Sequence, residues 1–127
     1  ETAGAAADGV WSTSLLSPAH QTSKLARYMA AFRQRCAEKY PGRNCDPEQY
    51  DVAVYDILRF VVDIMKKIKV AGASDRLQTE RDAIRDGLAD MRHYRGTAGM
   101  MGFDDKGDGL RTIYALEVKH GKWRDAF

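Results

Sequence analysis

The 127-residue sequence predicts an α/β fold built from one strand, three helices and a C-terminal β-hairpin. Its longest apolar-periodic run, residues 46–70, has the three- and four-residue spacing of an amphipathic helix. Residues 17–40 and 74–91 show similar spacing, whereas residues 10–15 are rich in β-forming side chains and residues 112–119 alternate as a strand does. Because strands flank the helices on both sides, the pattern favours a mixed α/β or α+β fold over a helical bundle.

The first strand is expected at Val10–Leu15, directly after Gly9. Ser17 and Pro18 are expected to cap the helix that follows. Its apolar positions keep helical spacing: Leu25, Tyr28, Met29, Phe32, Cys36 and Tyr40. The basic residues of this helix point elsewhere, which favours a solvated face; contact with an acidic partner or a membrane surface is the alternative.

The second helix is the main apolar element of the chain. Asp46 is expected to accept from its first free N–H groups, Pro47 suits the first helical position, and Glu48 favours the positive end of the helix dipole. Seven large apolar side chains share one stripe: Val54, Ile57, Leu58, Val61, Ile64, Met65 and Ile68. We expect that stripe to be buried, at roughly 1.5–3 kcal/mol for each side chain.

The third helix is expected to begin at Ser74 or Asp75, with Leu77, Ile84, Leu88 and Met91 on one side. The rest of the chain is punctuated by glycine. Phe103–Gly109 is predicted to be a turn, Thr112–Lys119 a strand, and His120–Lys122 a second turn that leads to Trp123. This tail accounts for the predicted hairpin.

Composition excludes some classes of protein. The chain is 44% hydrophobic and 30% charged, which is ordinary for a globular domain, and no stretch approaches the roughly 20 apolar residues of a membrane span. Its 20 basic and 18 acidic residues nearly balance and are spread along the helices, so nucleic acid is not an expected partner. The sequence has no initiator Met and its first nine residues read as the end of a helix running into a strand, so we expect a fragment.

Cys36 and Cys45 flank a tight turn between two helices, and a disulfide between them is geometrically feasible. Two reduced, partly buried thiols are the alternative. A metal site is not expected there, since the nearby ligands do not reach four. Asp104, Asp105 and Asp108 resemble half of a calcium loop, but the ligand spacing and closing Glu are absent, which favours a solvated turn.

The sequence offers no catalytic residue. His20, His93 and His120 are scattered, and none has a Cys or Ser partner in sequence that indicates nucleophilic catalysis. Gly-rich phosphate loops that open a helix are also missing. We therefore expect no enzyme activity and no cofactor.

Tyr50 is the aromatic residue of most functional interest. It lies in the first turn of the second helix, near N–H groups that favour anions, so its ring could face a bound ligand. Packing against the start of the helix is the alternative, and it is the commoner role of such an aromatic.

An ordered set of motifs extends over nearly the whole chain. It comprises Gly9-Val10-Trp11, Phe32 in the first helix, Gln49–Asp56, Tyr94–Gly99, Phe103–Asp108 and Tyr114–Trp123. In this order the set resembles the C-terminal third of type I periplasmic binding proteins of the leucine/isoleucine/valine-binding kind, the extracellular ligand-binding receptors of ABC transporters.

This resemblance implies two α/β lobes joined by three crossings, with a solute in the cleft between them. Residues 1–16 would then be the end of a helix and a hinge-crossing strand, residues 17–92 the helical part of the N-terminal lobe, and residues 93–127 the hinge return and C-terminal-lobe hairpin. Tyr50 would contact the solute, whereas the loops that grip the carboxylate and amine in the family have no counterpart here. The Cys36–Cys45 pair, which many relatives lack, would clamp the interhelical turn far from the solute.

The function that the resemblance implies is capture of a small amino acid or related carboxylate for an ABC importer. Its partners would be the solute and the membrane permease, and its location periplasmic, or extracellular and membrane-anchored. Two alternatives keep the same residues: a ligand-sensing domain of a regulator or receptor, and a self-associating α/β interaction fragment.

Overall fold

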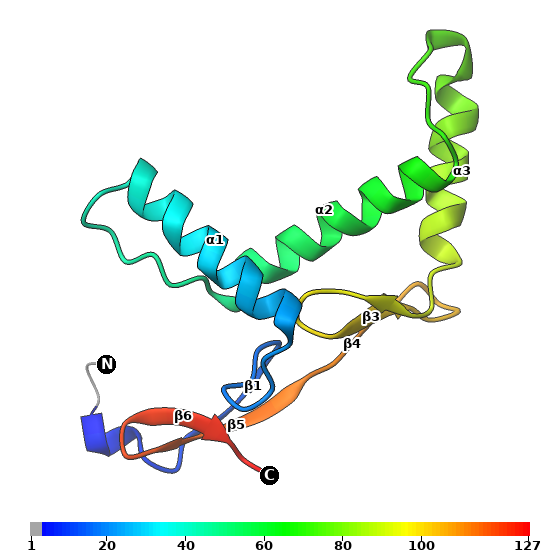
Figure 1. The fold of residues 1–127 in the computed structure, drawn as a ribbon. Coiled ribbons are helices and arrows are strands. Elements are labelled where there is room, and N and C mark those ends of the chain that lie inside the picture. The colour runs from blue at the N-terminus through cyan, green and yellow to red at the C-terminus, as the bar shows by residue number, and fades with distance from the viewer. Residues whose placement is uncertain (1–3) are drawn as a thin grey trace.

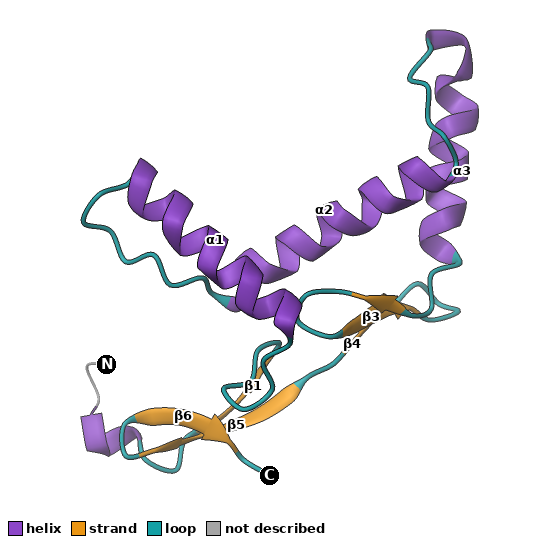
Figure 2. Cartoon of the chain, viewed as in Figure 1, coloured by secondary structure: helices purple, strands orange, loops and turns teal. Residues whose placement is uncertain are grey.

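The computed structural model describes residues 4–127 and has the mixed helix and strand content that the sequence predicts (Figure 1). The elements follow in the order η1 (Gly4–Ala7), β1 (Trp11–Ser14), α1 (Ser23–Lys39), α2 (Gln49–Lys67), η2 (Ser74–Arg76), α3 (Leu77–Ala89), β2 (Tyr94–Arg95), β3 (Met100–Phe103), β4 (Gly109–Arg111), β5 (Tyr114–Lys119) and β6 (Lys122–Asp125). Figure 2 shows the strands in two groups, with the three long helices beside one of them.

The strands form two separate antiparallel sheets. One has the order β1-β5-β6 and brings residues near both ends of the chain together, with Trp11 opposite Glu117 and Val118 opposite Trp123. The other has the order β2-β3-β4 and lies beside α2 and α3. The chain therefore has two structural parts, connected by the segments around residues 15–22 and 112–113.

The predicted C-terminal hairpin is confirmed. His120 and Gly121 connect β5 to β6, and both have positive φ angles, 54° and 70°. Two consecutive left-handed residues give the turn whose twist matches the flanking strands. The strand begins at Tyr114 instead of Thr112, because Thr112 belongs to the segment that passes from one sheet to the other.

The hydrophobic core lies between α2, α3 and the β2-β3-β4 sheet. Its centre consists of Phe60, Ile64 and Met101, with Ile68, Leu88, Met91, Tyr94 and Phe103 packed against them. Strand β3 runs so close to the end of α3 that a Cβ at Gly102 would lie 2.2 Å from the Arg92 carbonyl oxygen. The next residue, Phe103, donates its N–H to the Met91 carbonyl at 2.8 Å, which holds the two backbones this close together. Only glycine therefore fits at position 102.

The expectation of a single buried stripe on α2 is wrong. Of the seven side chains only Ile64 is fully buried, while Leu58 is 62% exposed and Val54 57% exposed. The buried face is instead the row Val52, Asp56, Phe60 and Ile64. Apolar periodicity failed here because α2 is apolar on more than one face, and spacing alone does not say which face the chain covers.

Two predicted helix starts are also wrong. Helix α1 begins at Ser23, where the Thr22 hydroxyl accepts from the Leu25 N–H at 3.0 Å, so Ser17 and Pro18 do not cap it. Helix α2 begins at Gln49, so Asp46 does not cap it and Pro47 is not its first residue. Its cap is the reciprocal pair Glu48 and Asp51, each accepting from the other's backbone N–H.

The third helix was expected to begin at Ser74 or Asp75; a 3-10 turn begins there, at Ser74–Arg76, and α3 follows from Leu77. The buried Glu80 carboxylate accepts from the Ala71 N–H at 2.8 Å and the Gly72 N–H at 3.0 Å. These bonds lower the pKa of Glu80 and fix the connection between α2 and α3. No helix among residues 4–127 is long and apolar enough to cross a membrane.

Replacing Phe60 with alanine tests the core. Phe60 is 1% exposed and packs on Tyr94 with ring centroids 5.0 Å apart. We expect Phe60→Ala to lower the free energy of unfolding by about 3–5 kcal/mol, because it removes apolar contacts and leaves a cavity. Denaturation in urea measures this. The matched control Arg81→Ala, at an exposed position of α3, is expected to change stability by less than about 0.5 kcal/mol; an equal loss in both variants would contradict the placement of the core.

Candidate functional site

The connecting segment at residues 15–22 packs on the start of β5, directly after the second connection. His20 stacks on Tyr114 with ring centroids 5.5 Å apart and an interplanar angle of 22°. The Ala19 N–H donates to the Asp125 carboxylate at 3.0 Å, and the Leu15 N–H donates to the Gln49 side-chain oxygen at 3.1 Å. The connection is therefore tied both to sheet β1-β5-β6 and to the first residue of α2.

Ser17 and His20 form a contact that the sequence did not reveal. The Ser17 hydroxyl lies 3.1 Å from His20 Nδ1, and it also accepts from the backbone N–H groups of Ala19 and His20. A hydrogen bond from Ser17 is the main cause of the lowered pKa of Asp125. Ser17 is only 3% exposed and its oxygen is engaged by these backbone groups, so the cluster stabilises a turn and does not present a nucleophile.

The central contact of the site is the carboxylate of Asp56. This side chain is 4% exposed, and both its oxygens accept from the Thr97 N–H at 2.7 Å, while Oδ2 also accepts from the Ala98 N–H at 3.2 Å. A Cβ at Gly96 would lie 2.6 Å from Oδ2, so glycine is needed for the loop to reach the carboxylate. The predicted Gly-punctuated stretch 94–99 is thus a loop held by an acid on α2.

The same loop is held from its other side by α1. The Thr22 hydroxyl, which caps α1, donates to the Thr97 carbonyl at 3.0 Å, and Lys24 Nζ donates to the Arg95 carbonyl at 3.0 Å. Asp56, Thr97 and Thr22 therefore form a continuous hydrogen-bonded path between the two helices. Neither Asp56 nor Thr22 was predicted as a site residue. The sequence feature that could have indicated Asp56 is its position as an acidic residue among the apolar residues of α2.

Tyr94 adds a further polar contact to α2. Its hydroxyl donates to Asp63 Oδ2 at 2.7 Å, and its ring packs on Phe60. Burial, with this hydrogen bond to a carboxylate, raises the pKa of Tyr94 to about 12. The phenol therefore stays protonated and neutral through the physiological range.

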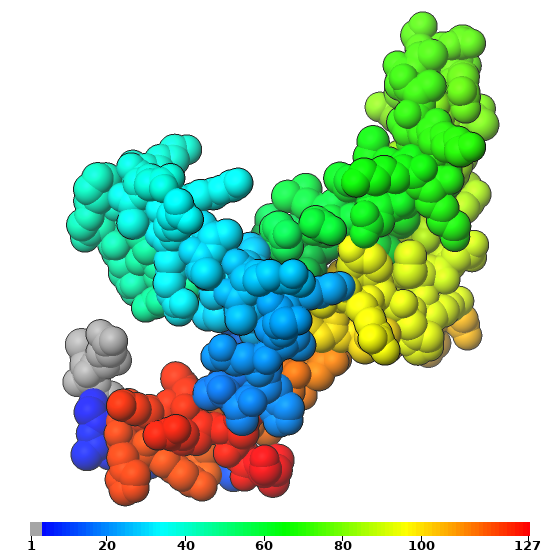
Figure 3. Space-filling view, in the orientation of Figure 1, coloured from blue at the N-terminus to red at the C-terminus, as the bar shows by residue number. Residues whose placement is uncertain are grey.

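A groove of about 1080 Å³ lies between α1, α2 and the loop at residues 94–97, and Figure 3 shows the hollow between the cyan and green helices. Tyr28 and Tyr55 meet across it with ring centroids 4.7 Å apart. Cationic side chains dominate its rim: Lys24, Arg27, Arg35, Lys39, Arg43, Arg59 and Arg95. Among the residues that the structure describes, none of these seven makes an ion pair.

The carboxylates of the groove are already engaged. Asp46 pairs with Arg33 at 2.8 Å, Asp56 accepts from the loop, and Glu48 and Asp51 form the cap of α2. The seven cations of the groove lining still outnumber its four carboxylates, and this excess of positive charge makes the groove attractive to anions.

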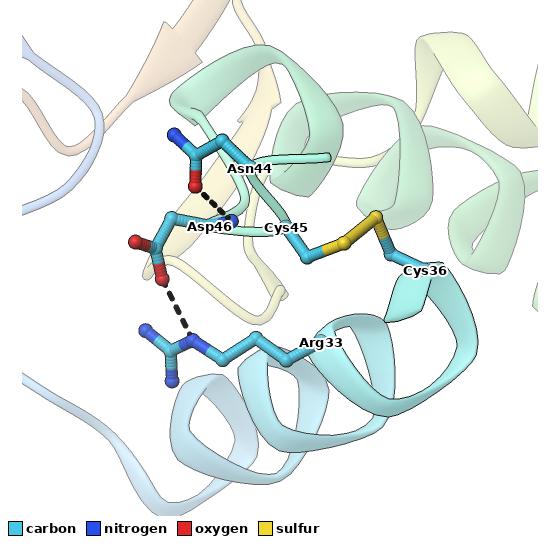
Figure 4. Close-up of a disulfide and its surroundings, with 5 residues drawn as sticks. All are labelled: Arg33, Cys36, Asn44, Cys45 and Asp46. Atoms are coloured by element: carbon cyan, nitrogen blue, oxygen red, sulfur yellow. Dashed lines mark hydrogen bonds and ion pairs between the residues drawn. A yellow bond between two sulfur atoms is a disulfide. The ribbon is translucent and has the colours of Figure 1, made fainter. Parts of the chain in front are cut away.

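The disulfide expected between Cys36 and Cys45 is present, and it joins the last turns of α1 to the segment before α2 (Figure 4). Arg33 and Asn44 hold Asp46 beside it, at 2.8 Å and 3.1 Å. Cys36 lies on the groove lining, so the disulfide fixes one end of the groove. Among residues 4–127 no cluster of His, Cys, Asp or Glu has the composition of a metal site.

Tyr50 lies in the first turn of α2 and is 71% exposed. It follows Gln49, which contacts the connection at Leu15, so its backbone lies where the two structural parts meet. Tyr50 does not line the groove between α1 and α2. Its contact with a ligand stays a prediction.

Comparison with known proteins adds to this geometry. No protein family and no curated protein sequence matches the chain. Among solved structures, an ABC transporter substrate-binding protein from Desulfitobacterium hafniense matches 97% of the chain at a TM-score of 0.69 and 24% identity. A leucine-binding protein from Thermotoga maritima matches 98% at 0.66 and 22% identity, and an R. palustris ABC transporter solute-binding protein in complex with benzoate matches 98% at 0.67 and 14% identity.

These similarities establish the fold. The chain spans about a third of each protein, 32% of the Desulfitobacterium protein and 31% of the other two. The predicted fold, part of a two-lobe type I periplasmic binding protein, is thus confirmed.

Replacing Asp56 with asparagine tests the central contact. An amide of nearly the same size places N–H groups opposite the Thr97 and Ala98 donors. We expect Asp56→Asn to lower the free energy of unfolding by about 1–3 kcal/mol, measured by chemical denaturation. Asp82→Asn, at an exposed ion pair on α3, is the control and is expected to cost less than about 0.5 kcal/mol. Equal stability of Asp56→Asn and the parent would contradict a structural role for this carboxylate.

Alkaline pH tests the Tyr94 contact. Because the pKa of Tyr94 rises from 10.0 to about 12 on folding, the unfolded chain releases this proton first. The free energy of unfolding should therefore fall as pH rises through this interval, and Tyr94→Phe should remove part of that fall. Denaturation at several pH values measures both. The control Tyr40→Phe, at an exposed ring, should keep the full pH dependence of the free energy of unfolding. If Tyr40→Phe reduced this dependence and Tyr94→Phe did not, the phenol with the raised pKa would not be Tyr94.

Proposed function

We propose that this chain forms part of the solute-capturing component of an ABC importer, and that a small amino acid or related carboxylate binds between its two lobes. The observation that carries the proposal is the fold similarity to ABC transporter substrate-binding proteins. The similarity covers 94% of the chain for a Desulfitobacterium hafniense protein in complex with Leu, and 98% for both the Thermotoga maritima leucine-binding protein and the R. palustris protein in complex with benzoate. One of these proteins is described as a complex with Leu and another as a complex with benzoate. Both molecules carry a carboxylate.

The arrangement of the two structural parts supports a hinge. Two connecting segments run between sheet β1-β5-β6 and the rest of the chain, and His20 of the first packs on Tyr114, the residue that follows the second. A small number of adjacent connections lets two rigid parts close on a ligand without rearranging either core. The resemblance places the return to the second lobe at residue 93. Because β3 and the residues around it pack on α2 and α3, we propose residues 112–113 for this boundary instead.

Tyr50 is the residue that we propose to contact the solute. The Tyr50 ring is exposed in this chain. The neighbouring Gln49 accepts a hydrogen bond from Leu15 in the connecting segment, so Tyr50 lies close to where the two lobes would close. The cationic groove between α1 and α2 does not include Tyr50, but its excess of positive charge raises the local concentration of anions around this part of the chain, which supports an anionic solute. We propose no enzymatic role. Ser17 and His20 are in contact, but Ser17 is buried and holds a turn. Binding a solute needs only a site of matching shape and charge.

The proposed location is periplasmic or extracellular, with a membrane permease as the partner that receives the solute. The Cys36–Cys45 disulfide supports an oxidising compartment.

Thermal unfolding of the two-lobe protein that contains this chain tests the proposal. We expect one carboxylate among leucine, isoleucine, benzoate and 3,4-dihydroxybenzoate to stabilise the protein, by about 2.7 kcal/mol at 100 times its dissociation constant. Benzamide and leucinamide, which lack the carboxylate, are the matched controls and should give no shift. The absence of a shift with every carboxylate would contradict solute capture.

The role of Tyr50 is tested in the same assay. Tyr50→Ala should weaken the solute about tenfold, which is about 1.4 kcal/mol. Leu77→Ala, at an exposed side chain of α3 that does not line the groove, should bind as the parent does. Unchanged affinity in Tyr50→Ala would leave the solute-capture proposal standing and remove this residue from it.

A further inference from the structure

The turn from Ser17 to His20 lies in a connecting segment but is tied to sheet β1-β5-β6, which we call the sheet part. The Ala19 N–H donates to the Asp125 carboxylate of β6 at 3.0 Å. The His20 ring stacks on Tyr114 of β5, with ring centroids 5.5 Å apart. Within the turn, the N–H groups of Ala19 and His20 both donate to the buried hydroxyl of Ser17. The turn therefore moves with the sheet part.

Two residues beyond this turn, the same segment is tied to the helical part, by which we mean the three helices and sheet β2-β3-β4. The Thr22 hydroxyl donates to the Thr97 carbonyl at 3.0 Å and accepts from the Leu25 N–H of α1 at 3.0 Å. Thr22 therefore moves with α1 and with the loop that Asp56 holds. Gln21 is the one residue between the turn that follows the sheet part and the cap that follows the helical part.

The other connecting segment narrows to one residue in the same way. The Thr112 N–H donates to the Met100 carbonyl of β3 at 3.2 Å. Thr112 also lies so close to Gly99 that a Cβ there would be 3.1 Å from the threonine hydroxyl oxygen, so this residue moves with the helical part. Tyr114 is the first residue of β5 and pairs with β1, so it moves with the sheet part. Ile113 is the one residue between them.

A single hydrogen bond crosses between the two parts away from these residues. The Leu15 N–H, directly after β1, donates to the side-chain oxygen of Gln49 at 3.1 Å. Gln49 is the first residue of α2 and precedes Tyr50, the proposed solute contact. Among residues 4–127 no other hydrogen bond joins the sheet part to the helical part, and no ion pair does. A rotation of one part against the other must therefore stretch or break this bond.

We propose that the two lobes rotate about Gln21 and Ile113, and that the hydrogen bond between Gln49 and Leu15 is a latch that holds the angle found in this structure. A residue with ties on both sides can absorb a change in φ and ψ while the ties persist, which is how hinge residues act. Gln49 is a positioning residue, because it links the start of α2, next to Tyr50, to the moving segment. The inference rests on the proposed function in taking the two parts as belonging to lobes that move.

Spin-label distances in the two-lobe protein that contains this chain test the hinge without any solute. One label is attached at Lys122→Cys on β6 and the other at Arg81→Cys on α3, and pulsed electron paramagnetic resonance gives the distribution of distances between them. We expect Gln21→Gly/Ile113→Gly to widen this distribution, because glycine admits more backbone conformations at both points.

Two controls separate hinge freedom from other effects. Gln21→Ala/Ile113→Ala removes the same side chains without adding the freedom of glycine, and Ala19→Gly adds that freedom inside the tied turn. Both should keep the distance distribution of the parent. An equal widening in Ala19→Gly, or no widening in the double glycine variant, would overturn the assignment of the hinge.

The latch is tested with the same labels. Gln49→Met removes the acceptor from a side chain of similar length, and it should change the ratio of the label distances by about two- to tenfold, the effect of one neutral hydrogen bond. Gln49→Glu keeps a side-chain oxygen and should restore the parent distribution, which a general loss of packing at the start of α2 would not allow. A distribution that Gln49→Met leaves unchanged would overturn the latch.

These measurements need no solute, so the hinge and solute capture can fail separately. If the label distances change as expected and no carboxylate gives a thermal shift, the hinge stands and the solute-capture proposal falls. If a carboxylate stabilises the protein but the double glycine variant leaves the distances unchanged, the hinge assignment falls and solute capture stands.

Discussion

The structure depends on one buried carboxylate. The Asp56 side chain is only 4% exposed, and it points toward the backbone of a loop about forty residues further along the chain. An unpaired carboxylate at such a site would be strongly unfavourable, but two backbone N–H groups and the missing side chain of Gly96 make room for it and stabilise its charge. The loop is therefore positioned by hydrogen bonds and not by apolar packing alone.

This contact organises the elements that the proposed function needs. The loop that Asp56 holds also accepts from Thr22, and Thr22 sets the start of α1 directly after the connection between the structural parts. Helix α2 reaches the same connection through Gln49. Hydrogen bonds close to the connection therefore fix the positions of α1 and α2 relative to it. A binding protein that closes by a hinge needs each lobe to be rigid in this way.

Much of the fold could be predicted from the sequence, and the reason is local. The β5–β6 hairpin follows from strand alternation and the His120-Gly121 turn, and the three helices follow from their periodicity. The covered face of α2 could not be predicted, because both stripes satisfy helical spacing and only tertiary contacts choose between them. The start of α1 was missed for a similar reason: Ser17 has the chemistry of a cap, but its hydroxyl is engaged in a turn with Ala19 and His20.

The candidate site was less predictable than the fold. Tyr50 and the cysteines are visible in the sequence because their chemistry is distinctive, whereas the path through Asp56, Thr97 and Thr22 joins residues up to 75 positions apart. Native-state hydrogen exchange of the Thr97 and Ala98 amides tests the central claim most directly. If Asp56 fixes this loop, both amides should exchange only through global unfolding, with the same free energy as the amide of Phe60. Exchange at the rate of a free loop, in a chain whose Phe60 amide stays protected, would contradict it.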